Sequence, residues 1–162
     1  MIKERCAHAC RRSQSGLAMV EFVLSVPVLL LLMFATFEFG HLLIQYSTLN
    51  DAVRNAARYV GGNALDGTTG DLKTGANWSS LVTQGTNLAI FGNIAGTGAP
   101  VLPSLNAANV ITVTPNGVAK YITVTAAYPY QPLFGAAIPT FMGAGSISTA
   151  FTLNISVTMS AL

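Results

Sequence analysis

The chain has 162 residues, of which 51% are hydrophobic and only 9% are charged, and its formal net charge is +2. This length accommodates about one domain. In soluble domains roughly a quarter of all residues are charged, so the composition argues against a free, concentrated soluble protein. Half of the lysines and arginines precede Gly16 and no basic stripe follows, so the charge gives no reason to expect nucleic-acid binding.

Residues 1–16 form a basic leader. Its charged residues are Lys3, Glu4, Arg5, Arg11 and Arg12. Both cysteines of the chain, Cys6 and Cys10, lie here and form a Cys-x-His-x-Cys pattern with His8. No fourth ligand follows at a zinc-like spacing, so we interpret them as incidental cytoplasmic thiols. We therefore expect no metal and no cofactor.

Residues 17–44 are apolar enough and long enough to cross a membrane, since a span needs about twenty mostly apolar residues. The polar or ionisable exceptions are Glu21, Ser25, Thr36, Glu38 and His41. Positive charge before the segment and little after it predicts that the N-terminus is cytoplasmic. Pro27 lies inside the predicted helix and removes a backbone donor, so we expect a kink or local loosening near residues 25–28.

Glu21 is a lone carboxylate near the start of this segment, five residues after Gly16. The apolar run is longer than a secretory signal core and no clear Ala-x-Ala site follows it, so we predict cleavage after Gly16. An amine and a carboxylate attract strongly in a low-dielectric setting, and each is costly there alone. Glu21 of one helix would then neutralise the new amine at Leu17 of a neighbour. The alternative is a carboxylate favoured near a helix start by the macrodipole.

The helix is predicted to continue through residues 45–61 as an amphipathic extension. An apolar stripe recurs at spacings of three and four, and it comprises Leu42, Tyr46, Leu49, Val53, Ala56 and Val60. The residues largely off this stripe are Gln45, Asn50, Asp51, Arg54 and Arg58. Gly61 and Gly62 end the helix, and a continuous helix over residues 22–60 would be about 58 Å long. The stripe packs either on the chain's own sheet or on a neighbouring helix.

Residues 62–162 are predicted to form an extracytoplasmic domain with a short helix and about three antiparallel strands. The helix covers residues 78–90, is capped by Asn77 and lies between loops at 62–75 and 92–103. A hairpin follows, with strands at 110–114 and 118–130 joined by a turn at 115–117. Pro129 and Pro132 end the second strand or confine it to an edge. A last strand covers residues 146–159, and the sheet packs against the outer half of the long helix.

Enzymatic function is not expected. After the leader the chain has one histidine, His41, and no cysteine, no clustered carboxylates and no phosphate-binding glycine loop. An active site needs a nucleophile, a base and an orienting group within hydrogen-bond reach, and these ingredients are missing.

The motif Gly16-Leu-Ala-Met-Val-Glu21 resembles the prepilin peptidase site of type IV pilin-like proteins. A longer pattern resembles the TadE-like minor pseudopilins of the tight-adherence (Flp) pilus system. It comprises Val20-Glu21-Phe22, Pro27, residues 29–32, Glu38-Phe39-Gly40 and Ala52-x-Arg54-x-Ala56-Ala57-Arg58-Tyr59, and residues 124–134 add a weaker likeness. His41 departs from the pattern, because many relatives carry Arg there. This departure leaves open whether the cationic partner of Glu38 is permanent or titratable.

The resemblance implies a type IV pilin-like α+β fold and a structural role in assembling a pilus for surface attachment and biofilm growth. It implies processing between Gly16 and Leu17, and it assigns assembly roles to Glu21, Phe22, Pro27, Glu38, Arg54 and Arg58. For Glu38 an equally open alternative is that it only marks the outer interface of the membrane span. The implied partners are a prepilin peptidase, the major Flp pilin, a second TadE/TadF-type pseudopilin, and the inner-membrane platform with its ATPase.

The implied location is the bacterial inner membrane, crossed once, with the C-terminal domain in the periplasm or carried into the extracellular pilus. The alternative function is a signal-anchored periplasmic binding or adhesive module that does not polymerise.

Overall fold

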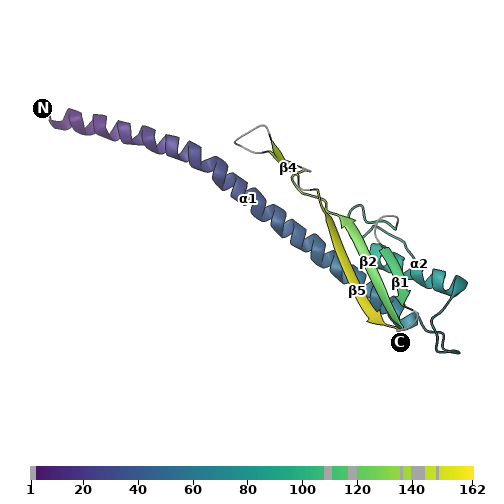
Figure 1. Ribbon diagram of the computed structural model, residues 1–162. Helices are drawn as coiled ribbons and strands as arrows, with labels where there is room; N and C mark the ends of the chain where they lie inside the picture. Colours follow the sequence, from purple (N-terminus) through teal and green to yellow (C-terminus); the bar gives the residue numbers. More distant parts are fainter. Residues whose placement is uncertain (1–2, 108–110, 117–119, 136, 140–144, 149) are drawn as a thin grey trace. The chain divides into compact units, whose positions relative to one another are not determined.

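The computed structural model describes residues 3–107, 111–116, 120–135, 137–139, 145–148 and 150–162 (Figure 1). The elements in chain order are α1 (Lys3–Asn63), α2 (Gly75–Phe91), β1 (Ile111–Asn116), β2 (Tyr121–Pro129), β3 (Ala137–Pro139), β4 (Ser146–Ser148) and β5 (Thr152–Ser160). The chain divides into two compact units, Met1–Gly40 and His41–Leu162. A long N-terminal helix followed by a small antiparallel sheet confirms the predicted α+β class.

Helix α1 runs through Pro27 and ends at Asn63, two residues later than Gly61 and Gly62 predict. Gly61 also has a packing role, since a Cβ there would lie 3.2 Å from the carbonyl oxygen of Ser160. The carbonyl oxygen of Gly61 accepts a hydrogen bond of 3.0 Å from the amide of Leu162. One of the carbonyls left free at the helix end is thereby satisfied by the chain that follows β5.

The main sheet has three antiparallel strands, as predicted, and their order is β1-β2-β5. Strand β2 is central and pairs with β5 over nine residues, from Tyr121 opposite Ser160 to Pro129 opposite Thr152. Alternate β2 residues are buried, because successive side chains point to opposite faces of a sheet. The buried residues of β2 are Ile122, Val124, Ala126 and Tyr128.

One apolar core holds the second unit together. Helix α1 contributes Leu49, Val53, Ala56, Ala57 and Val60, α2 contributes Leu81, Ala89 and Ile90, and the sheet contributes its buried face. The sequence leaves two partners open for the apolar stripe of α1, the chain's own sheet and a neighbouring helix. The structure places the chain's own sheet against the stripe, together with α2.

The stripe on α1 differs from the prediction at two positions. Tyr46 is 45% exposed, although it was predicted on the stripe, and Gln45 is 3% exposed, although it was predicted off it. Burial of Gln45 costs little because both ends of its amide are hydrogen-bonded to the backbone of Gln131. A pattern that counts only apolar residues cannot include such a position.

Helix α2 begins three residues before its predicted start. The residue before its first turn is Thr74, which makes no side-chain capping hydrogen bond, and Asn77 lies within the helix, so the predicted cap was wrong. The C-terminus follows the expected chemistry, because Gly92 adopts a left-handed φ of 72° and its amide donates to the carbonyl of Leu88.

The end of the first strand also differs from the prediction. Strand β1 continues through Pro115 and Asn116, which were predicted as turn residues, and Asn116 pairs with Tyr121. Pro115 is tolerated because β1 is an edge strand. Residues 117–119 of the predicted hairpin lie outside the described residues.

The predicted strand at 146–159 is divided into β4 and β5. Strand β4 pairs with β3 in a separate two-stranded ladder, whereas β5 pairs with β2. Alternation along the chain was present in both pieces, but it does not determine which strand each one pairs with.

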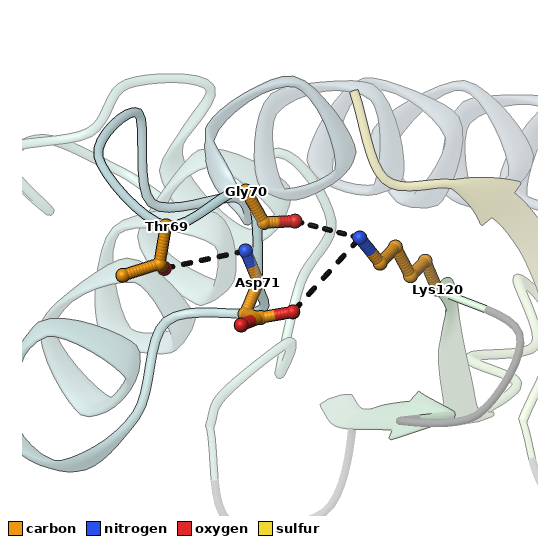
Figure 2. Close-up of polar contacts among 4 residues, drawn as sticks. All are labelled: Thr69, Gly70, Asp71 and Lys120. Carbon is orange, nitrogen blue, oxygen red and sulfur yellow. Dashed lines mark hydrogen bonds and ion pairs between the residues drawn. The ribbon is translucent and has the colours of Figure 1, made fainter.

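The loop between the helices is attached to the hairpin through Lys120 (Figure 2). The ammonium nitrogen of Lys120 donates to the carbonyl of Gly70 at 2.7 Å and lies 4.0 Å from a carboxylate oxygen of Asp71. The amide of Asp71 in turn donates to the hydroxyl of Thr69. This contact joins two segments 50 residues apart on the surface of the second unit.

Candidate assembly helix and processing segment

The first unit presents an uncovered apolar helix. Among the described residues, one helix is long and apolar enough to cross a membrane, the part of α1 from Gly16 onward, and none of its most apolar window is buried within the chain. Leu17 is 74% exposed and Phe22 is 65% exposed. These side chains are not covered within this unit, so they are suited to an apolar environment such as a membrane.

Gly16 and Leu17 both lie within α1 and are exposed. A Cβ built at Gly16 would meet no atom within 4 Å, and Gly16 has no positive φ. A glycine inside a helix costs about 1 kcal/mol relative to alanine, and here neither packing nor backbone conformation requires one. Gly40 has the same property.

The side chain of Glu21 is exposed on α1, next to the exposed ring of Phe22. The hydroxyl of Ser25 donates to the backbone carbonyl of Glu21 at 2.8 Å, so the carboxylate is not used in that contact. Helix α1 begins at Lys3, and the macrodipole acts mainly within the first turn. In the full-length chain Glu21 therefore lies too far along α1 to be explained by the macrodipole.

Pro27 and Glu38 are half-buried positions of the first unit. The exposed surface around them is mostly apolar, and of these two residues only Glu38 is ionisable. An ionisable residue in such a segment is costly and is by default functional. Glu38 lies near the end of the apolar run, as expected of a residue at the membrane interface.

His41 belongs to a polar contact that the sequence did not predict. The Nε2 atoms of His41 and Gln45 are 2.7 Å apart, and the Gln45 amide donates to the carbonyl of Gln131 at 2.9 Å. The amide of Gln131 donates back to Gln45 Oε1 at 3.3 Å. Because the amide nitrogen of Gln45 is a donor, Nε2 of His41 is the acceptor in this contact. The ring of His41 also lies 6.3 Å from that of Tyr130.

Arg54 and Arg58 lie on the exposed face of α1 in the second unit, away from its core. Arg58 lines a largely apolar cavity of about 510 Å³ with residues from the end of α1 and from β5. Both side chains are exposed, so the two guanidinium groups are accessible to other molecules.

Among the described residues, no group of three or more His, Cys, Asp or Glu side chains is arranged to hold a metal ion. The side chains of residues 6, 8 and 10, which form the Cys-x-His-x-Cys pattern, lie outside the described part of the chain.

The comparison with protein families concerns residues 16–58. The family model described as TadE-like protein matches residues 16–58, roughly a quarter of the chain. This region includes all eight residues to which the resemblance assigns a role, from Gly16 to Arg58. No curated protein and no solved structure matches the chain. Residues 16–58, which hold the motif around Gly16 and most of the long helix, are thus similar to the TadE-like family.

Proposed function

We propose that the chain is a minor pilin of a tight-adherence (Flp/Tad) pilus: a membrane-anchored subunit, cleaved by a prepilin peptidase after Gly16, that primes or joins the pilus. The observation that carries this proposal is the uncovered apolar surface of α1, interrupted near its start by the carboxylate of Glu21. The TadE-like match over residues 16–58 supports involvement in this pilus system.

The exposed surface of α1 suits a helix that exchanges one apolar environment for another. Residues 17–39 expose most of their large apolar side chains, and these are equally compatible with lipid and with the helices of a bundle. In the second unit the apolar face of α1 is already covered by the chain's own sheet and α2. Subunit packing through α1 therefore uses residues 17–39 and the polar face that carries Arg54 and Arg58.

Glu21 supplies the interaction that selects the register of this packing. Cleavage after Gly16 creates an amine at Leu17, four residues and about 6 Å of helix rise from Glu21. Two unit charges 4 Å apart attract by roughly 4 kcal/mol at an effective dielectric constant of 20, against about 1 kcal/mol in water. A charge left alone in the bilayer is costly, so neighbouring helices are favoured in the register that pairs each carboxylate with an amine.

The proposed partners follow from this role. They are the prepilin peptidase, the major Flp pilin, a second TadE/TadF-type pseudopilin, and the inner-membrane platform with its ATPase. Arg54 and Arg58 would contact acidic groups on one of these proteins, because both guanidinium groups point away from the core of the chain.

The test is replacement of Glu21 in the host bacterium. Glu21→Ala should leave cleavage intact and sharply reduce the number of pili, because the amine of the neighbour loses its partner. Ser25→Ala is the matched control, since it lies one turn along the helix and removes only a hydrogen bond to a backbone carbonyl. A normal number of pili on the Glu21→Ala strain would contradict the proposal and favour an anchored module that does not polymerise.

A further inference from the structure

The two edges of the three-stranded sheet differ in how well they are protected against pairing with another chain. Strand β1 carries Pro115, whose nitrogen has no hydrogen to donate, and proline is one of the residues by which natural proteins blunt an edge strand. Strand β5, at the other edge (Figure 1), contains no proline, no glycine and no charged residue from Thr152 to Ser160. Of the two edges, the one at β5 therefore suits an additional strand.

The hydrogen bonds at the two ends of β5 determine which of its backbone groups face away from the sheet. The amide of Tyr130 donates to the carbonyl of Phe151, and the amide of Ala161 donates to the carbonyl of Lys120. The register between β2 and β5 is continuous, and hydrogen-bonded pairs alternate with non-hydrogen-bonded pairs along an antiparallel ladder. The odd-numbered residues of β5 therefore bond to β2, and the backbone groups of the even-numbered residues point away from it.

These outward-facing backbone groups form what we call the open edge, which consists of Thr152, Asn154, Ser156 and Thr158. Within the described part of the chain, the recorded backbone hydrogen bonds of these residues and their neighbours in β5 go to β2. Ser160 is not included, because its carbonyl oxygen lies against Gly61 of α1. The side chains of the open edge are exposed, short and uncharged, so they do not hinder the approach of a further strand.

The open edge ends beside a cation. The exposed side chain of Arg58 lines the cavity of about 510 Å³ together with Thr158 and Met159. A strand added along β5 would reach this cavity and could bring a carboxylate to the guanidinium group. A second copy of β5 could not supply this carboxylate from a side chain, because the sequence contains no Asp or Glu after Lys120. Charge complementarity therefore favours a different chain as the partner.

We propose that the open edge binds an extended segment of another protein by β-strand addition, and that this segment carries an acidic residue that pairs with Arg58. In this kind of recognition, main-chain hydrogen bonds supply affinity and the pockets for side chains supply specificity. The site lies wholly within the second unit, from residue 41 onward. The proposal therefore does not depend on cleavage after Gly16 or on assembly of a pilus.

The test uses the full chain in non-ionic detergent micelles and the synthetic peptide Asp-Thr-Val-Thr-Val-Thr-Val, blocked at both ends. Antiparallel pairing, the more stable kind, places its aspartate at the end of the open edge near Arg58, on the same face of the peptide as the valines. A second peptide with Asn in place of Asp is the control. Binding is followed by hydrogen exchange of the backbone amides of β5, measured by NMR.

Without peptide, the amides of the open edge should exchange faster than those of the odd-numbered residues. The Asp peptide should slow them and should bind about fivefold more tightly than the Asn peptide, as expected of an exposed ion pair. Arg58→Ala should remove this difference. Arg54→Ala is the matched control and should preserve it, because Arg54 is also exposed but does not line the cavity.

Three results would overturn the proposal. Open-edge amides that already exchange as slowly as the odd-numbered ones would show that this edge is covered within the chain. Slowing that increases with protein concentration in the absence of peptide would identify a second copy of the chain as the occupant. Unchanged exchange with either peptide at millimolar concentration would show that the edge does not accept a strand. Equal affinity of the two peptides for the parent protein would refute the pairing with Arg58.

Discussion

Substitution of Gly85 tests whether α2 packs against α1 within the second unit. A Cβ added at Gly85 of α2 would lie 2.4 Å from Cγ2 of Val60 in α1, and both residues are buried. Overpacking of a core costs about 1–3 kcal/mol, and valine in a helix has one strongly preferred rotamer, so it cannot easily move aside. Alanine recovers up to about 1 kcal/mol of helix propensity. A separation of 2.4 Å is far shorter than an ordinary contact, which places the cost in the upper part of this range, so we expect Gly85→Ala to lower the free energy of unfolding by roughly 1–2 kcal/mol.

The assay is urea unfolding in detergent micelles followed by the fluorescence of Trp78, which lies in α2. Gly62→Ala is the matched control, because Gly62 is an exposed residue of α1 whose Cβ would meet nothing within 4 Å. That variant should be as stable as the parent or slightly more stable. The double variant Val60→Ala/Gly85→Ala should be more stable than the two single effects predict, by about 1 kcal/mol, since they act on one contact. A Gly85→Ala protein as stable as the parent would refute the packing of α2 on α1.

Three further predictions concern the second unit. Gln45→Met should lower the free energy of unfolding by about 1–3 kcal/mol, because the backbone amide and carbonyl of Gln131 lose their partner. Gln131→Ala keeps these backbone groups and should have a smaller effect. Equal urea midpoints for the two variants would contradict a stabilising role of the hydrogen bonds between Gln45 and Gln131. Burial raises the pKa of Tyr128 above its ordinary value of 10.0, so the stability this residue contributes is complete below about pH 10 and is lost as pH rises through the folded-state pKa. Tyr128→Phe should therefore be less stable at neutral pH, where it loses the hydrogen bond to Pro103, yet lose less stability than the parent on going from about pH 9 to pH 11; parallel pH profiles would count against this. Lys120→Met should change the free energy of unfolding by at most about 1 kcal/mol, since the ion pair with Asp71 is exposed. Hydrogen exchange of the backbone amides in the loop at residues 66–71 should become faster. Unchanged exchange would mean that Lys120 does not hold the loop.

Most of the architecture could be predicted because its signals are local. The charge-free run after Glu21, the spacing of Leu49, Val53 and Val60, and the alternation in β2 each reflect the period of one element. The motif formed by Gly16 and Glu21 could be recognised for the same reason, since only five positions separate the two residues.

The remaining features depend on partners far along the chain. Burial of Gln45 depends on Gln131, 86 residues away, and Pro115 fits its strand only because β1 is at the edge of the sheet. The division of residues 146–159 between two ladders depends likewise on the strands that each part meets. Local periodicity carries no information about any of these partners.

The most direct test of the central claim is the intact mass and N-terminal sequence of the protein purified from membranes of its host. The account predicts a chain that begins at Leu17, which places a free amine beside the register residue Glu21. A chain that retains its leader and begins at Met1 would contradict processing as a pilin, and one that begins beyond Phe39 would show that the apolar segment of α1 is a discarded signal.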